Sequence, residues 1–80
     1  MPASLTVYVR HGCHLCTDMV DELEVLKAEL DISYTLCDVD TDTVLVEKYG
    51  SRVPVLVGGD TEVCWYFLDR DSLREYCRSS

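Results

Sequence analysis

Two cysteines three positions apart, Cys13 and Cys16, are the residues of this chain best suited to chemistry. They follow an apolar run, Leu5 to Val9, and open a long amphipathic stretch that predicts a helix. In the first turn of a helix the backbone N–H groups lack partners and the dipole is positive, so a thiol there ionises more easily. We therefore expect Cys13 to be the attacking thiolate of a disulfide exchange and Cys16, one helical turn later, to be the resolving thiol.

Histidines next to these cysteines allow other interpretations. A protonated His14 would stabilise the Cys13 thiolate and make a disulfide there easier to reduce, whereas an outward-facing His14 would have no such effect. Thiolate and imidazole are also zinc ligands, and the segment holds four of them: His11, Cys13, His14 and Cys16. Because all four come from six consecutive residues, we predict no metal site within one chain; a metal or cluster shared between two chains through Cys13 is a separate possibility.

Size and charge exclude several classes of protein. The 80 residues allow one small domain, 1–80, and the hydrophobic fraction of 48% predicts a globular chain. A formal net charge of −8 argues against binding to nucleic acid or to anionic membranes. No basic start or long apolar segment precedes the first strand, so we expect neither a signal peptide nor a transmembrane helix. The five cysteines then favour the reduced thiols of the cytoplasm, with one cycling pair at most.

The remaining patterns predict strands and helices in a definite order. We expect strands at 5–9, 33–39, 53–57 and 63–67, and helices at about 15–30, about 42–49 and from 69–72 onward. Gly50 is expected to end the second helix in the left-handed conformation, and Ser72 with Glu75 to form a capping box. Residues 58–60 are expected to form a hairpin turn. This order predicts a parallel strand pair beside an antiparallel pair.

Buried positions follow from the same patterns. Helical spacing places the apolar residues of 15–30 on one face, with Val25 pointing away. The short second helix is expected to bury its apolar side: Val44, Leu45 and Tyr49. The aromatic run 65–67 is expected to pack on a sheet face rather than to bind a ligand. The remaining cysteines are expected to be small core residues: Cys37, Cys64 and Cys77.

Over residues 5–77 the chain resembles the thioredoxin-like fold, and within it the small glutaredoxin-like proteins. Three features carry the resemblance: the Cys13-x-x-Cys16 pair after the first strand, the Val53-Pro54 step that opens the third, and the hairpin with the final helix. The resemblance implies an α/β fold with a four-stranded mixed sheet and flanking helices, in the order β-α-β-α-β-β-α. It also implies that Pro54 is cis and lies against the dithiol, and that the Val53 backbone hydrogen-bonds a bound thiol substrate.

The chain departs from the family pattern at two places. His14-Leu15 stands between the cysteines, where typical glutaredoxins have Pro-Tyr and thioredoxins have Gly-Pro. The run 67–71, Phe-Leu-Asp-Arg-Asp, lacks the glycine pair that follows the fourth strand in glutaredoxins. Arg10, in contrast, occupies the place of a lysine that in glutaredoxins helps to bind a glutathione carboxylate. The motif therefore supports dithiol exchange more directly than glutathione binding.

Together these features predict a monomeric, cytoplasmic thiol–disulfide oxidoreductase with a role in electron transport. Cys13 would attack a protein disulfide or small-molecule disulfide and Cys16 would resolve the mixed disulfide. The residues expected to support the site are Arg10, His14, Val53 and Pro54. No cofactor or metal is expected, and glutathione is a candidate reductant and partner. The alternative is a non-catalytic module of the same fold that binds a protein partner or a metal through the same cysteines.

Overall fold

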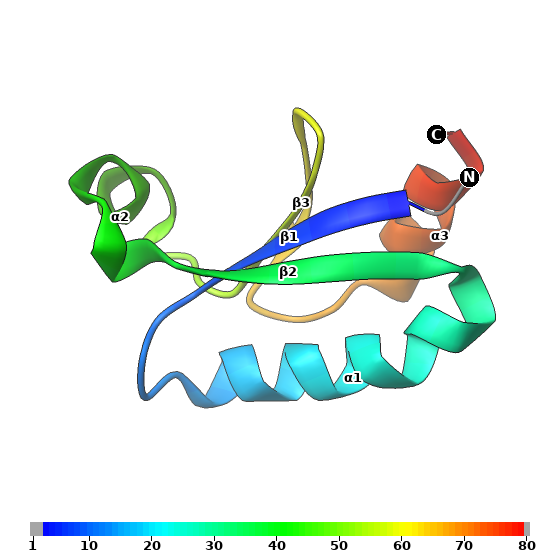
Figure 1. Cartoon of the computed structure of the whole chain (residues 1–80), viewed down its shortest axis with the longest axis horizontal. Helices are drawn as coiled ribbons and strands as arrows, with labels where there is room; N and C mark the ends of the chain where they lie inside the picture. Colours follow the sequence, from blue (N-terminus) through cyan, green and yellow to red (C-terminus); the bar gives the residue numbers. More distant parts are fainter. Residues whose placement is uncertain (1–2, 80) are drawn as a thin grey trace.

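The computed structural model describes residues 3–79, which form a four-stranded sheet with helices packed on its faces (Figure 1). Along the chain the elements are β1 (Ala3–Val9), α1 (His14–Leu30), β2 (Ile32–Asp38), the 3₁₀ turn η1 (Val39–Thr41), α2 (Thr43–Tyr49), β3 (Val55–Gly58), β4 (Thr61–Trp65) and α3 (Arg70–Ser79). The sheet order is β2-β1-β3-β4, with β1 parallel to β2 and antiparallel to β3, and β4 antiparallel to β3. This is the mixed α/β arrangement predicted from the sequence.

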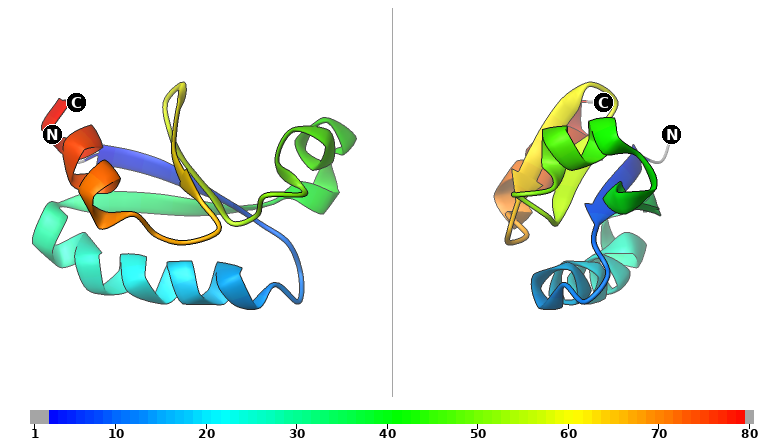
Figure 2. Two further views of the ribbon diagram at one scale, coloured as in Figure 1. Left: turned by 180° about the vertical axis from the view of Figure 1, so that it is seen from behind. Right: turned by 90° about the vertical axis from the view of Figure 1, so that its left-hand side faces the viewer.

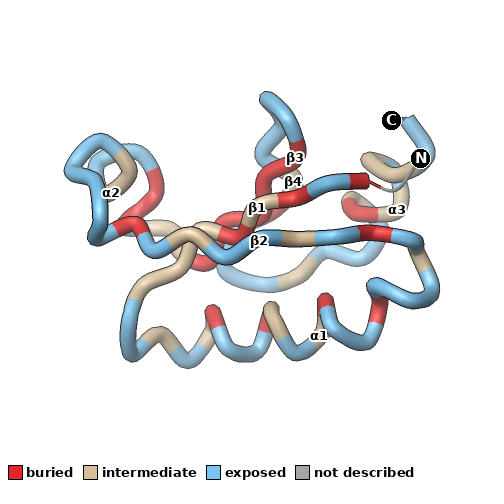
Figure 3. The backbone as a smooth tube through the Cα atoms, viewed as in Figure 1, coloured by how far each residue is buried: buried red, intermediate tan, exposed pale blue. Residues whose placement is uncertain are grey.

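Apolar spacing sets α1 against one face of the sheet. Met19, Leu23 and Leu26 lie on one side of the helix and are buried, whereas Val25 is 71% exposed. The buried side packs with alternate residues of β1 and with Leu73 of α3 in one core. Figure 3 shows the buried positions of α1 turned toward the sheet. This packing fixes the N-terminus of α1, and with it the cysteines, at one end of β1.

The short helix α2 covers part of the opposite face (Figure 2). Tyr49 stacks on Tyr8 of β1, with ring centroids 4.3 Å apart, and packs with Val55 and Val57 of β3. Because side chains alternate across a strand, Leu56 faces the α1 core while its neighbours face α2. Val55, Leu56 and Val57 are therefore buried between the two cores, and the last residue of β3, Gly58, is buried as well.

Two predictions for α2 are wrong. Gly50 has right-handed dihedrals, φ −53° and ψ −34°. A larger residue does not fit there, since a Cβ would overlap the Val46 carbonyl. Val44 is 63% exposed, while Leu45 and Val46 pack with Tyr49. At 3.6 residues per turn, Val44 lies roughly 140° around the helix from Tyr49, and the other two lie within about 60° of it.

The predicted sheet packing of the aromatic run is also wrong. β4 ends at Trp65 rather than at residue 67, because Tyr66 takes a φ of 66° and leaves the extended conformation. Side chains 65–67 are exposed. The Tyr66 N–H donates to the Pro54 carbonyl at 2.9 Å, and its hydroxyl donates to the Ser51 carbonyl at 3.0 Å. These bonds tie the end of β4 to the segment before β3, and β3 itself begins two residues later than predicted.

Asp69, and not Ser72, caps the last helix. Its carboxylate accepts the Ser72 N–H at 3.1 Å, which places Ser72 inside the first turn of α3 and rules out the predicted capping box. Hydrogen bonds from the backbone and side chain of Ser72 lower the pKa of Asp69 below its ordinary value of 3.8. The cap therefore favours the ionised carboxylate in the folded state.

We expect Asp69→Asn to weaken the acid dependence of stability. A carboxyl with a lowered folded-state pKa contributes stability above its ordinary pKa and loses it as the pH falls through the folded-state value. Asparagine keeps a capping oxygen but does not titrate. Urea unfolding between about pH 6 and about pH 2 should show a smaller loss of stability than in the parent. Asp60→Asn, in the β3–β4 turn, controls for the loss of one charge, and equal acid dependence in all three proteins would contradict the cap assignment.

Candidate functional site

The cysteine pair lies where β1 passes into α1. After Val9 the chain turns at Gly12, whose φ is 75°. Residues with a Cβ pay roughly 1–2 kcal/mol for this left-handed conformation, so glycine is the suitable residue here. Cys13 follows as the N-cap of α1, with extended dihedrals of φ −91° and ψ 108°. The turn thus delivers Cys13 to the end of the helix where N–H groups lack partners.

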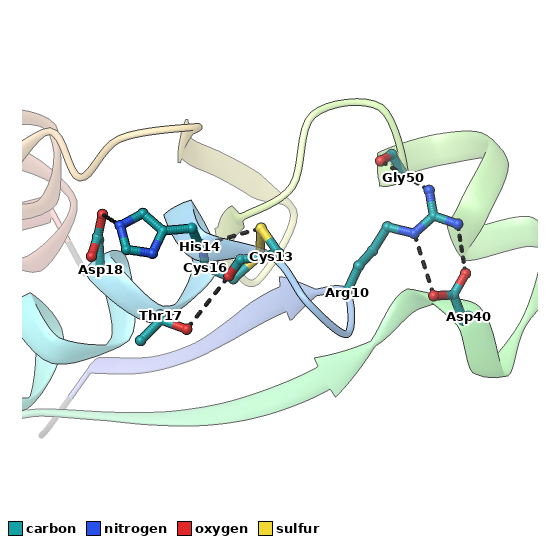
Figure 4. Close-up of a disulfide and its surroundings, with 8 residues drawn as sticks. All are labelled: Arg10, Cys13, His14, Cys16, Thr17, Asp18, Asp40 and Gly50. Atoms are coloured by element: carbon teal, nitrogen blue, oxygen red, sulfur yellow. Dashed lines mark hydrogen bonds and ion pairs between the residues drawn. A yellow bond between two sulfur atoms is a disulfide. The ribbon is translucent and has the colours of Figure 1, made fainter.

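Cys13 and Cys16 form a disulfide across the first turn of α1 (Figure 4). Their Cα atoms are 5.2 Å apart, a separation that helical spacing supplies. The Cys13 Sγ also accepts a hydrogen bond from the Cys16 N–H at 3.2 Å. Cys13 is half-buried, whereas Cys16 is 4% exposed. A thiol or disulfide arriving from solution therefore reaches Cys13 first.

The helix terminus favours negative charge on Cys13. A thiolate formed there would keep the Cys16 N–H as a donor and would face the positive end of the helix dipole. Thr17, which the sequence reasoning missed, secures this turn: its N–H and its hydroxyl donate to the Cys13 carbonyl at 3.3 and 3.4 Å. The signal for it was a hydroxyl four residues after the cap, where it can bond back to the previous turn.

Arg10 lies on the other side of the loop and forms hydrogen bonds with η1 and with the C-cap of α2. Its guanidinium contacts Asp40 through Nη2–Oδ1 at 2.8 Å and Nε–Oδ2 at 3.3 Å (Figure 4). A third bond, at 3.5 Å, reaches the Gly50 carbonyl. The hydrogen bonds and charge of Asp40 raise the pKa of Arg10. A glutathione carboxylate would have to share this guanidinium with Asp40, and the binding role expected of Arg10 stays a prediction.

His14 is directed away from the disulfide. Its Nε2 lies 3.5 Å from Asp18 Oδ2, one turn along α1, and its side chain is 88% exposed (Figure 4). In this geometry the imidazole pairs with a carboxylate rather than with the Cys13 sulfur. Among residues 3–79, no group of three or more His, Cys, Asp or Glu side chains is placed to hold a metal ion.

The proline step precedes β3. The Val53–Pro54 peptide bond is cis and Pro54 is fully buried. Val53 is half-buried and packs against the core under α2. The contact of Pro54 with the dithiol, and hydrogen bonds from the Val53 backbone to a substrate, stay predictions.

The other cysteines lie away from the disulfide. Cys64 is buried in the main core, as predicted, and burial raises the pKa of its thiol. Burial also raises the pKa of the half-buried Cys77. Cys37, on β2, is half-buried as well. Elevated thiol pKa values make Cys64 and Cys77 poor nucleophiles compared with a cysteine at a helix N-terminus.

A groove of about 620 Å³ opens beside the disulfide. Its walls come from the loop 10–14, the start of α1 and the end of β2. Leu36, which is 52% exposed, is part of the β2 wall. The sequence reasoning treated Leu36 only as a strand former. Strand alternation could have indicated its position, because it puts Leu36 on the same face of β2 as Tyr34. That face is turned toward α1, since the Tyr34 hydroxyl donates to Glu24 of this helix.

The sheet order, the flanking helices and the disulfide at the β1–α1 junction define a thioredoxin-like fold. The family model Glutaredoxin-like domain (DUF836) matches residues 4–77, and the chain belongs to this glutaredoxin-like family. Family and cysteine pair together indicate a redox-type module. None of the helices in the described part of the chain is long and apolar enough to cross a membrane.

Solved structures agree with this assignment. The chain is similar to the protein Ne2328 from Nitrosomonas europaea, with 40% identity, a TM-score of 0.88, and coverage of 95% of this chain and 92% of that one. It is also similar to the protein XcR50 from X. campestris, with 32% identity, a TM-score of 0.75, and coverage of 95% and 97%. No curated protein matches the chain in sequence.

Proposed function

We propose that this protein is a thiol–disulfide oxidoreductase in which Cys13 attacks a substrate disulfide and Cys16 resolves the mixed disulfide. The observation that carries the proposal is the asymmetric Cys13–Cys16 disulfide at the start of α1. Its outer sulfur is reachable and accepts a backbone N–H, whereas its inner sulfur is buried. A reachable, stabilised thiolate suits attack, and a buried neighbour suits an intramolecular second step.

The exchange balances without a cofactor. The Cys13 thiolate forms a bond to one substrate sulfur, and the other substrate sulfur leaves as a thiolate. Cys16 then loses its proton and attacks the Cys13 Sγ, which releases the second substrate thiolate. Two electrons pass from the dithiol to the substrate disulfide, and protons from Cys16 and from water neutralise the released thiolates. An external thiol, for which glutathione in the cytoplasm is our candidate, must then reopen the Cys13–Cys16 bond.

Equilibration in a series of glutathione redox buffers tests this function. After quenching with an alkylating agent, peptide mass spectrometry should find a Cys13–Cys16 bond that forms and opens reversibly, with a glutathione adduct at Cys13 and none at Cys16. Cys64 is the internal control, since burial keeps its thiol from the buffer. If the pair stayed in one redox state across the whole series, the oxidoreductase proposal would be wrong.

A further inference from the structure

The groove beside the disulfide carries an excess of carboxylates. Arg10 is the one lysine or arginine among its lining residues in the described chain, and Asp40 already holds that guanidinium. Asp21 and Asp38 line the same groove and are exposed. The Asp38 carboxylate also caps η1 by accepting the Asp40 N–H at 2.9 Å, which fixes its position. With His11 and His14 counted as neutral, the side chains that line the groove therefore carry a net negative charge, in keeping with the net charge of −8.

The groove also has an apolar wall. Leu36 projects from β2 with half of its surface in contact with water, and Val9 and Val20 line the groove with it. Covering such a leucine with an apolar side chain stabilises a complex by removing hydrocarbon surface from water. An apolar wall next to carboxylates, all within one groove that includes Cys13, fits a segment of polypeptide better than a small polar thiol.

We propose that this groove selects disulfides of polypeptides in which a basic and an apolar residue flank the cystine, and disfavours anionic disulfides such as oxidised glutathione. A lysine or arginine near the cystine would face Asp21 and Asp38, while the apolar neighbour would cover Leu36. Each half of oxidised glutathione instead brings two carboxylates into a groove whose guanidinium is occupied. This inference rests on the proposed function and concerns the rate of exchange, so equilibria in glutathione buffers do not depend on it.

The test compares two peptides that differ only in the residues beside the cystine. Each contains one disulfide and one leucine, and the cystine is flanked by lysine in one peptide and by glutamate in the other. The protein is reduced beforehand, mixed with each peptide, and quenched with an alkylating agent at intervals to give the rate constant of its oxidation. At low ionic strength the lysine peptide should react at least about tenfold faster, and high salt should reduce the ratio because it screens exposed charges.

Variants identify the residues responsible. The double variant Asp21→Asn, Asp38→Asn should lower the ratio of the two peptide rate constants to about threefold or less. The control is a second double variant, Asp42→Asn, Asp60→Asn, which also removes two negative charges and should leave the ratio unchanged. Asparagine at position 38 keeps the capping oxygen of η1. Leu36→Ser should slow reaction with the lysine peptide about fivefold and spare the small neutral hydroxyethyl disulfide. Val25→Ser, on the outer side of α1, is the control for loss of an exposed apolar side chain.

The outcomes separate the two proposals. If both peptides oxidise the protein but the glutamate peptide is as fast as the lysine peptide, the charge selection is wrong and the oxidoreductase function stands. Selection by Leu36 is wrong if Leu36→Ser slows the peptide and hydroxyethyl disulfide equally. If no disulfide of any kind oxidises the Cys13–Cys16 pair, the proposed function and this inference both fail.

Discussion

Replacing Cys13 by serine is expected to slow disulfide exchange by on the order of a thousandfold or more, because no other residue of the site supplies a thiolate at the mouth of the groove. Cys16→Ser has a different consequence. The first attack remains possible, but the mixed disulfide on Cys13 can then be cleared only by a thiol from solution. The Cys16 variant should therefore accumulate a covalent adduct with its substrate.

Both variants can be measured with one assay. Samples of the reaction, quenched at intervals and analysed by intact-protein mass spectrometry, should show no adduct for Cys13→Ser and a stable one-to-one adduct for Cys16→Ser. Cys37→Ser, which removes a half-buried thiol from β2, is the matched control and should turn over at the parent rate. Retention of exchange activity in Cys13→Ser would mean that the nucleophile has been assigned to the wrong cysteine.

The position of the cysteine pair was predictable because it depends on local patterns. An apolar strand, a glycine turn and an amphipathic helix follow one another within a few residues, so Cys13 had to lie at a helix N-terminus. The partners of Arg10 were not predictable in this way. Asp40 lies 30 residues further along the chain, and only the crossover that brings η1 back beside the end of β1 creates the ion pair. The same crossover makes Leu36 a wall of the groove.

The errors in the fold arise where a local pattern has more than one structural outcome. Aromatic residues continue past Trp65, so local propensity extends the strand, but hydrogen bonds of Tyr66 with the segment before β3 end it. Gly50 has the sequence signature of a left-handed helix end, but it adopts right-handed dihedrals, and a Cβ there would overlap the carbonyl of Val46, one turn earlier in α2. The long helix α1 was predicted closely, because its residues favour a helix locally and the same helix buries its apolar face.

Helix α1 has two roles, since the helix that stabilises the core also positions both cysteines. Leu23 is 0% exposed and packs among α1, β1 and α3. We expect Leu23→Ala to lower the free energy of unfolding by about 2–5 kcal/mol, through lost hydrophobic contact and the cavity that remains. A chain of this length has a total stability of roughly 4–12 kcal/mol, so a large part of it would be lost. Val25→Ala, in the same helix but exposed, should change stability by less than about 0.5 kcal/mol.

Urea unfolding measures both substitutions, and an equal loss in the two would show that α1 does not depend on this core. The site supplies an independent readout. Cys16 is buried by the same helix packing, so in the reduced protein its alkylation requires α1 to open. Leu23→Ala should accelerate alkylation of Cys16 while leaving that of Cys13, which is reachable without opening, close to the parent rate. Acceleration confined to Cys16 would tie the protection of the resolving thiol to the apolar face of α1.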